Sequence, residues 1–158
     1  MSKLYSKKMI YAAKQLLSES AEKMIGFTCA DTKMNTAKNQ DISTVYNVLS
    51  KESKNILLLN LDPEFSADFS YIDAPVKDET ISYDLETALK GTDVSQYDKI
   101  LVNFCPTQNK GYLFDPNIAV KEIVLCVKYG ATTYTNFEKS VDLFTQNGIR
   151  LIGTLAHK

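Results

Sequence analysis

Thiol and imidazole side chains, which often serve as nucleophiles, acid–base groups and metal ligands, are few in this sequence. Cys29, Cys105 and Cys126 lie far apart along the chain, and two of them have apolar neighbours. This spacing indicates neither a disulfide framework nor a CxxC metal site. The single histidine, His157, is next to the last residue, which argues against a zinc site or a Ser-His-Asp triad within the fold. We expect the three thiols to be small buried apolar groups.

The composition is that of an ordinary globular domain. Of 158 residues, 44% are hydrophobic and 23% are charged, and 18 basic side chains against 19 acidic ones give a net charge of −1. These proportions exclude wholesale disorder. The charges are interspersed, so the sequence carries no signal for direct nucleic-acid binding. We interpret residues 1–158 as one domain.

The sequence shows no signal for export or for membrane insertion. The longest apolar runs, Ile56–Leu59 and Ile123–Val127, are far too short to span a bilayer. The first residues lack the apolar core and the small-residue cleavage site of a signal peptide. We therefore expect a cytoplasmic protein that reaches a membrane only through a partner.

Apolar spacing predicts alternating helices and strands. Helical spacing predicts helices over residues 4–17, around 42–49, around 85–89 and over 132–147. Apolar runs predict buried strands at residues 24–30, 55–61, 99–104, 122–127 and 150–155, with a short edge strand at 69–72. Gly91 and Gly148 are placed to end the helices before them. This order predicts the α/β class, with a mainly parallel sheet and helices on both faces in three layers.

Ligands of such sheets bind beyond the carboxyl ends of the strands, and three strand ends here carry recognisable motifs. These segments read Lys33-Met-Asn-Thr-Ala-Lys-Asn-Gln40, Asn60-Leu-Asp-Pro63 and Tyr97-Asp-Lys-Ile-Leu-Val-Asn-Phe-Cys-Pro106. They resemble the deviant phosphate loop K-G-G-x-G-K-T-T, the D-x-D-P strand end and the Walker B strand of the ParA/MinD group of P-loop ATPases. The bacterial capsule tyrosine kinases are relatives of that group. The resemblance covers about residues 22–158 and implies a three-layer P-loop NTPase-like fold.

The phosphate loop departs from the family pattern at its glycines. A phosphate loop needs glycine because its backbone N–H groups converge on phosphate, often in left-handed conformations and without a Cβ in the way. The three glycine positions hold Met34, Asn35 and Ala37. The resemblance implies that Lys38 reaches the β- and γ-phosphates and that Lys33 reaches the nucleotide of a partner subunit. The alternative is that both lysines are solvated side chains in a polar loop.

The magnesium ligands of the family are also replaced. Asn39 stands at the position of the magnesium-binding hydroxyl, and Asn60 and Asn103 stand at two strand-end aspartates. Asparagine lacks the negative charge of aspartate. We therefore expect magnesium affinity or activity to fall by at least the roughly 10–100-fold that changes in outer-shell partners cause, and phosphoryl transfer to be absent or very slow. We expect Asn60 and Asn103 to be structural groups that bond loop backbone rather than metal ligands. We expect Asp62 to be a turn residue before Pro63, and the alternative is a group that orients water.

We interpret the chain as a catalytically inactive ParA/MinD-like domain that binds a protein partner. The partner would be another copy, or an active ATPase of the same family, and the resemblance implies contact across the nucleotide face. The interpretation expects no catalytic residue, no metal and no cofactor. Its vestigial nucleotide site consists of Lys33, Lys38, Asn39, Asn60, Asp62 and Asn103. The alternative is a divergent ATPase or capsule-type tyrosine kinase that binds ATP and magnesium through Lys38.

Overall fold

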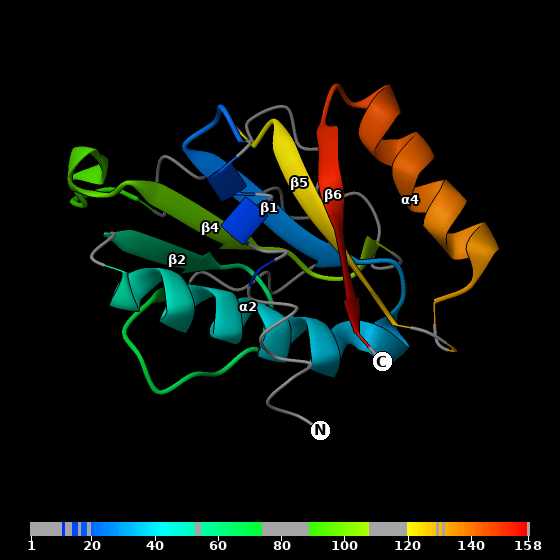
Figure 1. Ribbon diagram of the computed structural model, residues 1–158, viewed down its shortest axis with the longest axis horizontal. Helices are drawn as coiled ribbons and strands as arrows, with labels where there is room; N and C mark the ends of the chain where they lie inside the picture. The colour runs from blue at the N-terminus through cyan, green and yellow to red at the C-terminus, as the bar shows by residue number, and fades with distance from the viewer. Residues whose placement is uncertain are drawn as a thin grey trace.

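The centre of the fold is a parallel sheet of six strands (Figure 1). This computed structural model describes residues 11, 14, 15, 17, 18, 20–52, 55–73, 89–107, 120–128, 130 and 132–157. The strands are β1 (Met24–Cys29), β2 (Ile56–Asn60), β3 (Ile72–Asp73), β4 (Lys99–Asn103), β5 (Glu122–Lys128) and β6 (Arg150–His157). Their order in the sheet is β3-β2-β4-β1-β5-β6, and every pairing is parallel. The predicted α/β class and parallel sheet are confirmed.

Helices cover both faces of this sheet, as predicted. Helix α2 (Asn35–Lys51) packs on one face, and helix α4 (Tyr134–Gln146) lies beside β6 and packs on the other (Figure 1). Because β2 is buried on both faces, its side chains alternate between two cores. Leu58 joins Ile42 of α2 in one core, while Leu57 joins Phe144 of α4 in the other. The three layers follow from this division.

Some predicted elements differ from the structure or lie outside the described residues. The edge strand predicted at 69–72 is wrong in position, because the two-residue strand β3 lies at Ile72–Asp73. The helix predicted around 85–89 lies almost entirely outside the described residues, although Gly91 has the positive φ of 83° expected there. The described residues of the 4–17 helix are helical, and Leu17 is buried in the core with α2. Gly148, with φ of 69°, follows α4 as predicted.

The topology brings the carboxyl ends of β1, β2 and β4 together. Strand β1 lies between β4 and β5, so the strand order reverses there, and such a reversal is where open α/β sheets bind ligands. Asn103 at the end of β4 is in register with Asn60 of β2 and with Phe27 of β1. In the part of the chain that is described, no helix is long and apolar enough to cross a membrane.

Candidate functional site

The segment that resembles a phosphate loop passes directly into helix α2. A short 3-10 helix η1 (Thr32–Met34) follows β1, and α2 starts at the next residue. Met34 has φ of −89° and ψ of −7°, and Asn35 has φ of −60° and ψ of −39°, so both are right-handed. The backbone at these two positions therefore does not use the left-handed conformation that the family glycines allow. The Met34 side chain is instead fully buried, and the Thr132 hydroxyl lies 3.8 Å from its sulfur.

The two lysines of this segment have opposite environments. Lys38, in the first turns of α2, is 0% exposed, although lysine is almost never fully buried without a partner. Its Nζ donates to Oδ2 of Asp62 at 3.1 Å and to the backbone oxygen of Phe104. Lys33, in η1, is exposed. The solvated-lysine alternative thus agrees with Lys33 and is wrong for Lys38.

Asp62 is the acceptor at the centre of the site. Its Oδ2 accepts from Nδ2 of Asn35 at 2.9 Å, from Nζ of Lys38 and from Nδ2 of Asn39 at 3.1 Å. Its Oδ1 accepts from the backbone N–H of Glu64 at 3.0 Å. Burial acts to raise the pKa of Asp62, but the Lys38 charge and these hydrogen bonds outweigh it, so the pKa lies below its usual value of 3.8. Asp62 is therefore a buried carboxylate held in its charged form, not merely a turn residue.

The three asparagines at the predicted magnesium positions bond to one another. Nδ2 of Asn103 donates to Oδ1 of Asn39 at 3.1 Å and to Oδ1 of Asn60 at 2.9 Å. Asn60 also bonds the loop backbone, as expected, because its Nδ2 donates to the Asp62 carbonyl at 2.8 Å. Asn103, however, bonds side chains rather than backbone, so the expected backbone role is wrong for it.

The orientation of each amide follows from its neighbours. Asn39 must turn its Nδ2 to the Asp62 carboxylate, and Asn60 must turn its Nδ2 to the Asp62 carbonyl and to Oδ1 of Asp73. Both therefore present Oδ1 to Asn103, which must donate to both. The Oδ1 of Asn103 is the atom left buried without a partner in this network, a position that costs free energy.

This arrangement does not match what magnesium–ATP requires. Mg²⁺ is bound through carboxylate and phosphate oxygens in near-ideal octahedral geometry. Here amides occupy the three ligand positions, Asn103 turns its N–H groups inward, and the carboxylate of Asp62 is bonded to Lys38. Among the described residues, no group of three histidine, cysteine, aspartate or glutamate side chains could hold a metal ion.

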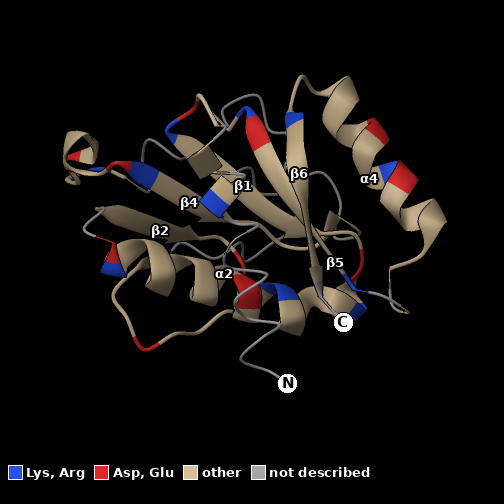
Figure 2. Cartoon of the chain, viewed as in Figure 1, with Lys and Arg blue, Asp and Glu red and all other residues tan. Residues whose placement is uncertain are grey.

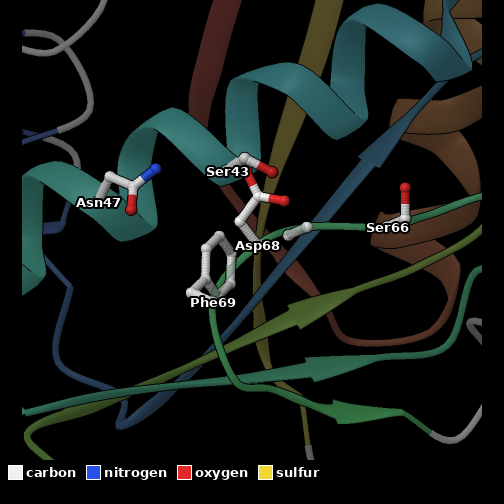
Figure 3. A pocket seen from close by; sticks show the side chains of 6 residues that line it. Ser43, Asn47, Ser66, Asp68 and Phe69 are labelled. Atoms are coloured by element: carbon white, nitrogen blue, oxygen red, sulfur yellow. The ribbon is translucent and has the colours of Figure 1, made fainter.

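A polar groove lies beside this network, between α2 and the segment that follows β2. Two pockets of about 610 and 430 Å³ share Ser43 and Ser66, and we call them together the α2 groove. In Figure 3, Ser43 projects from α2, and Asp68 and Phe69 project from the facing segment. The wall is fixed by aromatic packing, since Tyr46 of α2 stacks on Phe69 with ring centroids 3.9 Å apart. These volumes are within the range of small-ligand pockets.

All three cysteines are free and buried, as the sequence predicts. Burial is the main reason that the pKa of Cys29 rises to about 12, and Cys126 shifts in the same direction. A thiol that stays protonated is a poor nucleophile and a poor metal ligand, so Cys29 and Cys126 act as core groups, although Sγ of Cys29 also lies 3.9 Å from Oδ1 of Asn35.

The comparisons with known proteins identify the fold. No family model and no curated protein matches the sequence. Among solved structures, the tyrosine kinase domain of BceF matches with a TM-score of 0.63 and 14% identity, over 93% of this chain and 73% of that one. This chain therefore shares the fold of that domain. The kinase domain of the Escherichia coli tyrosine kinase ETK matches with a TM-score of 0.61 and 13% identity, over 94% of this chain and 74% of that one. This kinase fold agrees with the relationship that the three strand-end motifs indicate.

Sequence reasoning named six site residues but missed several of their partners. Five of them, all except the exposed Lys33, form one connected network at the predicted strand ends. The missed residues are Asn35, which bonds both Asp62 and Glu64, and Asp73, which bonds Asn60. The signal available was the position of the acidic residues Glu64 and Asp73 next to strand ends, where their carboxylates can accept from the amides of Asn35 and Asn60.

Proposed function

We propose that this chain is a catalytically inactive ParA/MinD-like domain of kinase fold that acts through binding a protein partner. The observation that carries the proposal is the closed network at the strand ends. Lys38, which the resemblance assigns to the phosphates, bonds to Asp62 instead. The groups at the magnesium positions bond to each other. Because the charges are compensated within the chain, the domain needs neither nucleotide nor metal to satisfy this edge of the sheet.

The proposed contact surface is the edge of the domain next to this network. The resemblance implies that family members meet across their nucleotide face, where Lys33 is exposed in η1, just before α2. With the central charges compensated inside each domain, two such faces can meet without ATP between them. The partner is a second copy or an active ParA/MinD-like ATPase, and any membrane contact is made through that partner.

Calorimetric titration with ATP and MgCl₂ tests the inactive state. We expect no heat of binding from the wild-type protein at micromolar to millimolar nucleotide. Asp68→Ala, which alters an exposed carboxylate in the α2 groove, is the matched control for indirect effects of removing charge. Micromolar affinity that disappears in Lys38→Ala, with the variant shown to be folded by circular dichroism, would overturn the proposal.

Sedimentation velocity tests the proposed contact surface. We expect a concentration-dependent dimer that Lys33→Glu shifts towards monomer, because a reversed charge at an interface opposes association. Lys51→Glu is the control, since Lys51 is also exposed but lies at the other end of α2. A strict monomer at high concentration would count against self-association and leave the active ATPase as the proposed partner.

A divergent ATP-binding kinase or ATPase is the second candidate, and two observations favour it. The two solved structures described above, which share this fold, are kinase domains. Lys38 lies at the strand–helix junction where the resemblance places the phosphate-binding lysine. On this alternative, ATP would have to displace Asp62 from Lys38, and the same titration would detect it.

A further inference from the structure

The pairing of Lys38 with Asp62 is unusual for a purely structural contact. Both side chains are almost fully buried, at 0% and 3% exposure. Removing two charges from water is costly, and a buried ion pair is often no more stable than two apolar side chains of similar size. The pair also lies at the strand ends, where ligands bind, rather than within either hydrophobic core. Stability alone therefore gives no reason for two charges here.

The donors around Asp62 are arranged as donors are around a bound anion. Two amide N–H groups and one ammonium group, from Asn35, Asn39 and Lys38, converge on a single oxygen, Oδ2. All three belong to the first turns of α2. The start of a helix, with a lysine beside it, favours phosphate and other oxyanions. The acceptor in this structure is a carboxylate of the chain itself.

We propose that Asp62 is an internal anion that fills the oxyanion site at the start of α2 and keeps this site closed to phosphate. This inference rests on the proposed function, because it gives the physical reason why the nucleotide site of this fold would be silent here. The ligand class of the opened site is a small oxyanion, such as phosphate or acetate, bound without metal. In the intact protein the carboxylate competes with such ions at very high effective concentration.

The site borders the α2 groove. Asn39, which donates to Asp62, and Glu64, whose backbone N–H also bonds Asp62, both line the 430 Å³ pocket of the α2 groove. Asn39 is only half-buried. Removing the Asp62 carboxylate would thus leave Lys38 and the amides of Asn35 and Asn39 around a cavity beside the groove, with the Glu64 carboxylate, which also accepts from Asn35, as a neighbour.

Anion rescue of Asp62→Ala tests the proposal. The variant leaves Lys38 buried without its counterion, and added phosphate or acetate would take the empty position. Thermal unfolding followed by circular dichroism, at constant ionic strength set with NaCl, would show a rise of about 5 °C at roughly 100 times the dissociation constant. Wild-type protein would show no specific rise. Equilibrium dialysis would show radiolabelled inorganic phosphate bound to the variant and none bound to wild type.

Two further variants make the result specific. Asp68→Ala removes an exposed carboxylate from the same segment and should gain no anion response. Lys38→Met combined with Asp62→Ala removes the cation and should lose the rescue. If Asp62→Ala does not fold, Asp62→Ser supplies a small hydroxyl for one donor and should show the same anion dependence.

The outcomes separate this inference from the proposed function. Folded Asp62→Ala or Asp62→Ser with no response to phosphate or acetate would overturn the inference, as would an equal response in Asp68→Ala. Equally tight phosphate binding by wild type and by Asp62→Ala would also overturn it, because the Asp62 carboxylate would then not exclude phosphate from the site. Binding of magnesium–ATP to wild type, by contrast, would overturn the proposed function.

Discussion

Two buried carboxylates lie at opposite ends of the sheet, and each is held by a cation. At the carboxyl ends of the strands, Asp62 bonds Lys38, whose side chain is 0% exposed. At the amino ends of β5 and β6, Glu122 is 4% exposed and bonds Arg150, whose side chain is 63% exposed. Figure 2 shows this second pair as a red segment at the start of β5 beside a blue one at the start of β6.

The difference in exposure separates a structural contact from a candidate site. Glu122 also accepts from the Ser20 hydroxyl and the Glu22 N–H, so it ties the segment before β1 to the sheet edge. Because the guanidinium of Arg150 stays in contact with water, its charge has little desolvation cost. A structural role is therefore enough to explain this contact. Lys38 has no such access to water and pairs with Asp62 at the edge where ligands bind. This contrast is what supports an internal anion at one end only.

The largest expected effect comes from removing Lys38, and removing Arg150 is the comparison. Lys38→Met leaves the Asp62 carboxylate buried without its counterion and should reduce the free energy of unfolding by about 3–5 kcal/mol. Arg150→Met exposes Glu122 to solvent, leaves two of its hydrogen bonds, and should cost about 1 kcal/mol or less. Urea unfolding followed by circular dichroism measures both values. Equal losses would remove the contrast between the two ends of the sheet.

The asparagine network should resist the return of a carboxylate. In Asn103→Asp, a carboxylate oxygen would face Oδ1 of Asn39 and Oδ1 of Asn60, where two hydrogen bonds exist now. Loss of these bonds and repulsion between acceptors should cost about 2–3 kcal/mol in urea unfolding. Asn47→Asp, on an exposed face of α2, is the control and should change stability by about 0.5 kcal/mol or less. If MgCl₂ restored the stability of Asn103→Asp, the network would prove able to accept a cation.

The fold was predictable because its signals are local and periodic. Runs such as Ile56–Leu59 are apolar on both faces, which indicates a buried parallel strand, and Phe137, Val141 and Phe144 mark one face of α4. The strand β3 was misplaced because two residues carry too little pattern to read. The helical start at Asn35 was not foreseen, since family glycines at this position suggest a loop.

The positions of the site were predictable, but its bonding was not. Parallel strands bring their carboxyl ends together, so Asn60 and Asn103 could be placed near the lysines from the sequence alone. The burial of Lys38 depends on Asp62, a residue in another loop, and no local pattern reports that contact. The orientation of Asn103 depends on four neighbouring polar groups at once and appears only in three dimensions.

Replacing both Lys38 and Asp62 by apolar residues should change stability less than removing either charge alone. The double variant Lys38→Met, Asp62→Leu removes both charges together and should unfold within about 1 kcal/mol of wild type, because a buried ion pair rarely outperforms apolar side chains. The single variants should each lose about 3–5 kcal/mol, so a double-mutant cycle should give a coupling of about 5 kcal/mol or more. Additive losses in the cycle would mean that Lys38 and Asp62 act independently.

The smallest expected effect is on the acid dependence of stability, and it distinguishes the two carboxylates. The pKa of Asp62 is lowered from 3.8 in the folded protein. The contribution of this carboxylate to the free energy of unfolding is therefore complete above pH 3.8 and is lost as the pH falls through the folded-state pKa. The pKa of Glu122 is lowered from 4.5, because the Ser20 and Arg150 hydrogen bonds outweigh burial, and its contribution is lost on the same side. Urea unfolding of wild type and of Lys38→Met, Asp62→Leu between about pH 6 and pH 3 measures the difference. The double variant should lose the Asp62 share of the acid dependence and keep the Glu122 share, and identical pH profiles would contradict an ionised Asp62 in the folded protein.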